Sequence, residues 1–255
     1  PALGVEMLLQ AYSIISRQTI DAGFMQPQNT PACLMWRLWI GLALATLLWD
    51  ATPLDRIAVD AIGSPGGFPL QHHPVLEVWL HDRFRAAAWL VFLAGWAWAL
   101  RPADTAYTTR SDRVFLMATV VFNLLLVSVL KHFSLTSCPW AIADWGGVGR
   151  YVSHWQWGAA DGGGGRCFPG GHASAAWGFF PLVVAAWWPA TDRSAHPKAR
   201  LVTVVFVLAA LTTAATQTLR GAHYPSHTLW TAILCAGSTL LAWTIWLRRR
   251  NQSFA

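Results

Sequence analysis

The amino-acid sequence predicts an all-α membrane protein, a polytopic bundle of about six transmembrane helices. Of its 255 residues, 55% are hydrophobic and 12% are charged, whereas a soluble domain has about 25% charged residues. The chain also contains 17 tryptophans, and indole rings favour the boundary between lipid and water. The apolar residues fall into runs close to the ~20 residues that a helix needs to cross a bilayer. Composition and run length therefore agree on the fold class.

Six apolar runs are the predicted transmembrane helices. They are Cys33–Leu48, Phe84–Leu100, Val114–Leu130, His172–Trp188, Leu201–Leu219 and Thr228–Leu247. Several are shorter than the ~20 residues of a full span, so polar flanking residues must complete them. We expect one membrane domain over residues 33–250.

Residues 1–32 have no clear assignment from sequence. They lack the basic start and the uninterrupted apolar core of a secretory signal peptide. Two interpretations stay open: an amphipathic surface segment, or an extension upstream of a natural start at Met25 or Met35.

The short basic loops predict the orientation of the chain. Most arginines and lysines lie in "RPADTAYTTRSDR" (101–113), "TDRSAHPKAR" (191–200) and "LRRR" (247–250). Because basic loops stay in the cytoplasm, the segments 49–83, 131–171 and 220–227 are expected on the periplasmic or exterior side of a bacterial-type inner membrane. The net charge of +6 comes from these clusters and not from one basic face, so we expect no nucleic-acid partner.

Polar residues gather in two of the outward segments, next to the ends of the predicted spans. They are Lys131, Arg166, His172, Arg220, His223 and His227. Taken singly, Lys131 could extend to the interface and His172 could be an interfacial histidine. His223 and His227 share a helical face, but no third ligand or HExxH motif makes them a zinc site. Ionisable groups at a membrane face are costly unless they serve a site, so the set predicts a functional site. We expect this site to need no metal or cofactor.

This set of side chains suits phosphoryl transfer. Lysine and arginine neutralise the equatorial oxygens of a transferring phosphoryl group. Gly170 and Gly171 lack side chains, so their amides can approach an anion at the start of the fourth run. One histidine can attack phosphorus while a second, protonated histidine supplies a proton to the leaving oxygen.

Three segments carry a resemblance to a known family. Lys131 is followed by "HFSLTS" and Cys138-Pro139; Pro169-Gly170-Gly171-His172 comes next; "TQTLRGAHYPSH" contains His223. In order and spacing they resemble the motifs Lys-x6-Arg-Pro, Pro-Ser-Gly-His and Ser-Arg-x5-His-x3-Asp of the type 2 phosphatidic acid phosphatase superfamily of membrane lipid phosphatases. The motifs cover residues 120–227.

The resemblance implies a helical bundle with its site at the outer face. It implies that His223 is the nucleophile that forms a phosphohistidine and that His172 is the general acid. It further implies that Lys131 binds phosphate and that Gly171 supplies a backbone N–H.

Four positions depart from the family motifs. Cys138 stands in place of arginine, Gly170 of serine, Gln217 of arginine and His227 of aspartate. Arg220 and Arg166 are candidates to supply the two missing guanidinium groups. The lost carboxylate would orient the nucleophile; a neutral His227 could accept a hydrogen bond from His223, or Asp144 or Asp161 could take over.

Two cysteines lie in the same outward segment, one at each of the first two motifs. Since that compartment permits disulfides, we predict a bond between Cys138 and Cys167 that joins the two motifs. Cys33 and Cys235 lie within predicted spans and are interpreted as small packing residues.

The predicted activity is removal of phosphate from a lipid phosphate or pyrophosphate at the outer leaflet. Undecaprenyl pyrophosphate, phosphatidylglycerol phosphate, phosphatidic acid and lipid A are candidate substrates. A phosphotransferase, a non-catalytic lipid-phosphate binder or transporter, and a vanadium haloperoxidase relative are the alternatives. The segment "HHPVLEVWLHDRF" (72–84) is a candidate interfacial helix that screens substrates. Neither the head group nor the oligomeric state follows from the sequence.

Overall fold

The computed structural model describes residues 31–102, 108–187 and 196–252. The prediction for residues 1–32 therefore lies almost entirely outside the described residues. The chain divides into two compact units, residues 1–38 and residues 39–255. Every feature that positions the site belongs to the second unit.

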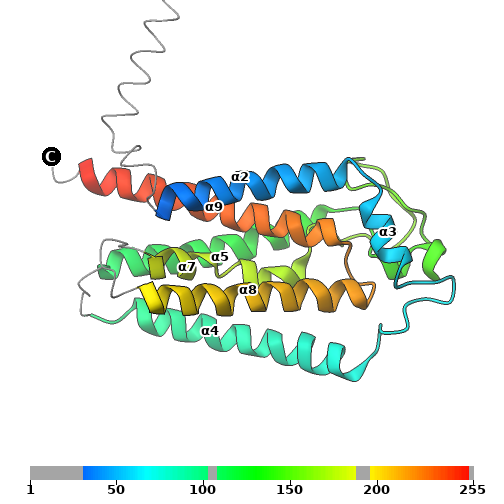
Figure 1. Ribbon diagram of the computed structural model, residues 1–255, viewed down its shortest axis with the longest axis horizontal. Coiled ribbons are helices and arrows are strands. Elements are labelled where there is room, and N and C mark those ends of the chain that lie inside the picture. Colours follow the sequence, from blue (N-terminus) through cyan, green and yellow to red (C-terminus); the bar gives the residue numbers. More distant parts are fainter. Residues whose placement is uncertain (1–30, 103–107, 188–195, 253–255) are drawn as a thin grey trace, which may run out of the picture. The chain divides into compact units, whose positions relative to one another are not determined.

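The regular secondary structure of the described residues is helical, with two isolated β-bridges at Ser64–Gly67 and Ile142–Gly149 (Figure 1). In chain order the helices are α2 (Pro31–Asp50), α3 (Leu54–Asp60), the π-helix η1 (Val75–Arg83), α4 (Phe84–Ala99), α5 (Arg110–Phe133), the 3-10 helices η2 (Pro139–Ala141), η3 (Ala143–Trp145) and η4 (Gly171–Ala173), then α6 (Ser174–Trp177), α7 (Phe180–Trp187), α8 (His196–Leu219) and α9 (Pro225–Gln252).

Four of the predicted spans are confirmed as helices long and apolar enough to cross a membrane. They are Ala32–Asp50, Arg110–Phe133, Pro197–Leu219 and Pro225–Arg250. The second predicted run forms α4, a helix of 16 residues that continues directly from η1.

The fourth predicted run differs from the expected single helix, because η4, α6 and α7 replace it. Pro181 has no N–H and cannot continue the ladder of helical hydrogen bonds. Gly178 lies so close to α5 that an added Cβ would come within 2.8 Å of the Leu124 side chain. The carbonyl of Gly178 accepts a hydrogen bond from the buried Asn123 of α5 at 3.3 Å. The interruption is therefore built into the contact with α5.

Two helix ends explain how the loops near the site are held. Gly221 ends α8 with a φ of 70°, a left-handed conformation that favours glycine. The carboxylate of Asp55 accepts a hydrogen bond from Ser226 N–H at 3.0 Å and one from the Ser226 hydroxyl. An anion at this position favours the start of α9, where the backbone N–H groups have no helical acceptor.

The three segments expected on one side of the membrane are in contact with one another. Arg56 pairs with Asp144 at 2.6 Å, and Trp140 N–H donates to the carbonyl of Gly221 at 3.0 Å. Val59, Phe68, Ile142, Trp145 and Tyr224 form a buried cluster across the same segments. At the other end of the long helices, Arg250 of α9 pairs with Asp112 of α5 at 2.5 Å. The predicted outward segments thus meet at one end of the helices, and Asp112 and Arg250, which belong to two of the predicted inward segments, meet at the other end.

Candidate active site

His223 follows directly on the end of α8. The N–H groups of Ala222 and His223 both donate to the carbonyl of Gln217, at 2.8 and 3.2 Å. These bonds satisfy the last turn of α8 and direct the chain toward α9. The His223 side chain is 1% exposed. Its ring is therefore held in place by a helix end.

His172 lies in η4, which is fastened to the start of α9. Gly170 N–H donates to the carbonyl of His227 at 2.9 Å, and the Thr231 hydroxyl donates to the carbonyl of Gly170 at 2.9 Å. The Ser174 hydroxyl donates back to the carbonyl of Gly171 at 2.6 Å. The second and third motifs are thereby joined through the backbone.

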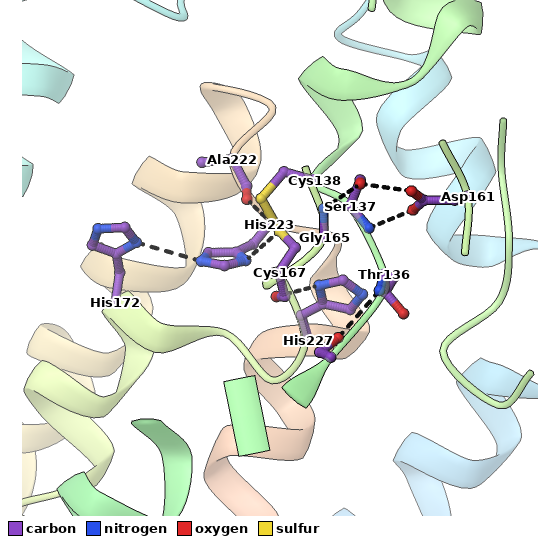
Figure 2. Close-up of a disulfide and its surroundings, with 11 residues drawn as sticks. Thr136, Ser137, Cys138, Asp161, Gly165, Cys167, His172, Ala222, His223 and His227 are labelled. Atoms are coloured by element: carbon purple, nitrogen blue, oxygen red, sulfur yellow. Dashed lines mark hydrogen bonds between the residues drawn. A yellow bond between two sulfur atoms is a disulfide. The ribbon is translucent and has the colours of Figure 1, made fainter. Parts of the chain in front are cut away.

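The two histidines converge, as Figure 2 shows. His172 Nδ1 lies 3.4 Å from His223 Nε2, and the ring centroids are 5.6 Å apart. At this separation both rings can contact one phosphoryl group, one at phosphorus and the other at an oxygen.

Lys131 brings the first motif to the same place. An added Cβ on Gly171 would lie 2.9 Å from Lys131 Nζ, so the ammonium group rests against the Cα of Gly171. Only a glycine allows this approach. The positive charge of Lys131 therefore stands beside η4, one residue from the imidazole of His172.

The predicted disulfide between Cys138 and Cys167 is confirmed. Cys167 N–H donates to the carbonyl of Thr136 at 2.9 Å, and Arg166 N–H donates to that of Ser134 at 2.7 Å. The two loop segments therefore run side by side, with the disulfide between them. Cys167 is fully buried, and its Sγ lies 3.2 Å from His223 Nδ1.

His227 does not take the place, next to His223, that the resemblance gives to a carboxylate. Its Nδ1 lies 2.9 Å from the carbonyl oxygen of Cys167, and its ring centroid is 6.1 Å from that of His223. The expected acceptance of a hydrogen bond from His223 is not what the structure has, because Cys167 lies on that side of the His223 ring.

The aspartates considered as substitutes are also engaged elsewhere. Asp161 accepts hydrogen bonds from Ser137 N–H at 2.5 Å, from the Ser137 hydroxyl at 2.8 Å and from Gly163 N–H at 2.9 Å. Asp144 pairs with Arg56. Asp161 therefore closes the glycine-rich loop, and Asp144 joins two outward segments.

The predicted phosphate-binding residues have different surroundings. Arg220 is 5% exposed; its Nε donates to the carbonyl of Gln71 at 2.9 Å, and one Nη donates to Glu77 at 2.9 Å. Much of its hydrogen-bonding capacity is thus used within the protein. Arg166 is exposed on the loop. Gly170 is not available as an anion donor, because its N–H already bonds to His227.

Sequence reasoning missed His81 as a site residue. Its Nε2 lies 2.6 Å from His172 Nε2, and its Nδ1 lies 3.0 Å from a carboxylate oxygen of Asp82. The segment 72–84 was expected to be an interfacial helix that screens substrates, and residues 75–83 of it form the π-helix η1, but nothing in the sequence indicated that His81 contacts His172. A π-helix is a frequent feature of functional sites, and here it places a third imidazole, that of His81, next to His172.

Burial, and to a smaller extent the charge of Lys131, favours the neutral form of His172 and His223. Burial, followed by His81 and Lys131, lowers the pKa of His172 to about 3. Burial, followed by His172, His227 and Lys131, lowers the pKa of His223 well below its usual value. A bound phosphate dianion would oppose both of these shifts.

A cavity of about 410 Å³ opens beside His172. Apolar side chains of α4 and α5, and Phe179 between α6 and α7, make up much of its wall; those of the two helices include Ala88, Phe92 and Leu124. Its polar lining residues include His81, Arg85, His172 and Gln217. The Gln217 side-chain oxygen is buried and has no hydrogen-bond partner among the described residues, so it offers an acceptor to a ligand there.

The one group of potential metal ligands among the described residues is Cys138, Cys167 and His223. Both sulfurs are in a disulfide, and a thiolate is the form that binds zinc. The arrangement therefore does not suit a metal ion in this oxidation state.

The described residues thus combine four helices that can span a membrane, as expected of a membrane protein, with two converging imidazoles and an adjacent lysine. The family model described as PAP2 superfamily matches residues 112–251, so the chain belongs to the PAP2 superfamily. This confirms the resemblance seen in the motifs. No curated protein and no solved structure matches the chain.

Proposed function

We propose that this protein is a metal-independent lipid phosphatase that acts through a phosphohistidine. Members of the PAP2 superfamily are phosphatases, which supports hydrolysis of a phosphate ester. The observation that carries the finer proposal is the 3.4 Å approach of His172 Nδ1 to His223 Nε2 beside Lys131.

The proposed reaction has two steps. In the first, the lone pair on His223 Nε2 attacks phosphorus and the bond from phosphorus to the leaving oxygen breaks, while that oxygen takes a proton from His172. In the second, water attacks phosphorus and gives a proton to His172, while the bond between phosphorus and His223 Nε2 breaks. Inorganic phosphate leaves, and His223 Nε2 regains its lone pair. Lys131 neutralises the charge on the phosphoryl oxygens.

His81 supports His172 in this scheme. The carboxylate of Asp82 accepts from His81 Nδ1–H, which leaves His81 Nε2 to accept from His172 Nε2–H. In the neutral state His172 Nδ1 and His223 Nε2 then both present lone pairs. One added proton on His172 Nδ1 completes the hydrogen bond between His172 and His223. This is the proton that the leaving oxygen takes.

The cavity favours a lipid as the substrate. Its wall is mostly apolar and includes residues of α4 and α5, and His81 and His172 are among its polar lining residues. An acyl or prenyl chain would occupy the apolar part while the phosphate reaches Lys131. Sites of this kind fix a ligand with a few polar groups in an apolar surround.

We also propose that α4 with η1, and α6 with α7, complete six spans with the site on the periplasmic or exterior side. The separation of the two loop sets to opposite ends of the helices supports this topology. The basic end of α9 then lies in the cytoplasm.

Phosphate release from lipid phosphates in detergent with EDTA tests the activity. His223→Ala and His172→Ala are expected to abolish release, because one removes the nucleophile and the other the proton donor. Release that persists in both variants, or that stops in wild type when EDTA is added, contradicts the mechanism. Trapping of ³²P on wild type but not on His223→Ala checks the intermediate.

Ala175→Phe tests whether the cavity binds the lipid chain. Ala175 lines the cavity, and a phenyl ring there would occupy space needed by the chain. We expect KM to rise about tenfold for a long-chain lipid phosphate and to stay unchanged for a short water-soluble phosphate ester. Equal effects on both substrates would place the lipid chain elsewhere.

A further inference from the structure

A nucleophilic histidine needs a partner for the ring nitrogen that does not attack. If Nδ1 keeps its proton, Nε2 carries the lone pair, and the neighbour of Nδ1 decides this tautomer. In the motif that this chain resembles, position 227 holds a carboxylate. Here it holds His227, which bonds to the Cys167 carbonyl instead.

The neighbour of His223 Nδ1 is a sulfur atom. Cys167 Sγ lies 3.2 Å away, and the same sulfur lies 3.1 Å from the carbonyl oxygen of Ala222 (Figure 2). Because this sulfur is bonded to Cys138, it carries no hydrogen and acts only as a weak acceptor. A hydrogen bond between Nδ1 and Sγ therefore requires the hydrogen to be on Nδ1 of His223.

The burial of the contact strengthens this argument. Cys167 is 0% exposed and His223 is 1% exposed, so water does not compete for Nδ1. The Cys167 peptide adds to the effect, since its hydrogen bonding raises the pKa of His223 against the larger lowering by burial. The sulfur of Cys167 thus contacts His223, and its carbonyl oxygen contacts His227.

We propose that Cys167, held as the disulfide with Cys138, is the positioning residue that sets the Nδ1–H tautomer of the nucleophile His223. This inference rests on the proposed role of His223. The proposal accounts for two departures from the family motifs together. Cys138 forms the disulfide, and the disulfide makes the carboxylate at position 227 unnecessary.

A consequence concerns the oxidation state. A dithiol reagent would pass two electrons and two protons to the S–S bond, giving two thiols and the cyclic disulfide of the reagent. A Cys167 thiol can donate as well as accept. The proton is then free to move to Nε2, which removes the attacking lone pair in part of the population.

A matched pair of variants separates positioning from simple cross-linking. Cys138→Ala and Cys167→Ala both lack the disulfide, but only the first keeps a sulfur atom beside His223. We expect kcat to fall about tenfold further in Cys167→Ala than in Cys138→Ala, with similar KM. Cys235→Ala, outside the disulfide, is the control for loss of a buried cysteine. Equal losses of kcat in the pair would show that the disulfide is only a cross-link and would overturn the proposal.

A spectroscopic readout keeps the proposal testable if the variants fold poorly or the activity itself is absent. The ¹⁵N shifts of the histidine ring in oxidised wild type should show His223 as the Nδ1–H tautomer, and a dithiol should convert part of it to Nε2–H. An Nε2–H tautomer in the oxidised protein overturns the proposal. Wild type that releases no phosphate contradicts the proposed function alone, because the tautomer is still measured.

Discussion

Replacement of Gly171 by alanine tests how Lys131 is placed. The new Cβ would lie 2.9 Å from Lys131 Nζ and 3.0 Å from its Cδ, where ordinary contact begins at 3.4 Å. The atoms in the way belong to the end of a flexible side chain, so the helices need not move. The ammonium group must instead withdraw by about half an ångström, a displacement that stability measurements would not detect.

The size of the effect follows from charge and distance. For unit charges about 4 Å apart near a protein surface, the attraction is about 4 kcal/mol and decreases inversely with distance. A half-ångström withdrawal costs ~0.5 kcal/mol, or about twofold. Complete loss of a hydrogen bond to a charged group costs about 1.5–3 kcal/mol. We therefore expect kcat/KM to fall by roughly threefold to tenfold.

Gly170→Ala is the matched control for the same change one residue earlier. Its Cβ would lie 3.1 Å from the carbonyl oxygen of His227 and 3.3 Å from Thr228 N, both backbone atoms at the start of α9. Overpacking against backbone costs about 1–3 kcal/mol, so this variant should have a lower melting temperature in detergent. Phosphate release and thermal unfolding are measured on both. A Gly171→Ala enzyme with the wild-type kcat/KM, or a pair with identical behaviour, would refute the assignment of Lys131 to the phosphate.

Two other predictions concern the imidazoles. His81→Gln keeps a polar group next to His172 but cannot relay a proton, so kcat should fall about tenfold and the acid limb of its pH profile should shift; an unchanged profile would remove His81 from the reaction. Because the pKa values of His172 and His223 are lowered, the unfolded chain binds more protons below pH ~6.5. The melting temperature should therefore be steady above that pH and fall below it, with a smaller fall in a His172→Gln, His223→Gln variant; a pH-independent melting temperature would contradict the burial of neutral imidazoles.

Much of the site was accessible from sequence because it depends on local order. Lys131, His172 and His223 each lie beside a helix end or an apolar run, and their spacing placed them at one face of the membrane. The disulfide was accessible for the same reason, since Cys138 and Cys167 lie in one segment. Four long spans followed from the length and composition of the apolar runs.

The contacts of these residues could not be predicted from the sequence. His81 lies 91 residues before His172 in the chain, and no sequence periodicity predicts a contact over that separation. Arg220 was expected at the phosphate, but its guanidinium donates hydrogen bonds to Gln71 and Glu77, because η1 packs against α8. The broken run after His172 likewise depends on its packing against α5.

By itself, the sequence determined the class of protein, the order of its motifs and the chemical groups available, because hydrophobic run length and residue type are local properties. The tertiary structure decided which atom faces which. The hydrogen bond of a buried imidazole depends on the nearest acceptor in space, and for His223 that acceptor is the sulfur of Cys167 and not the side chain at position 227.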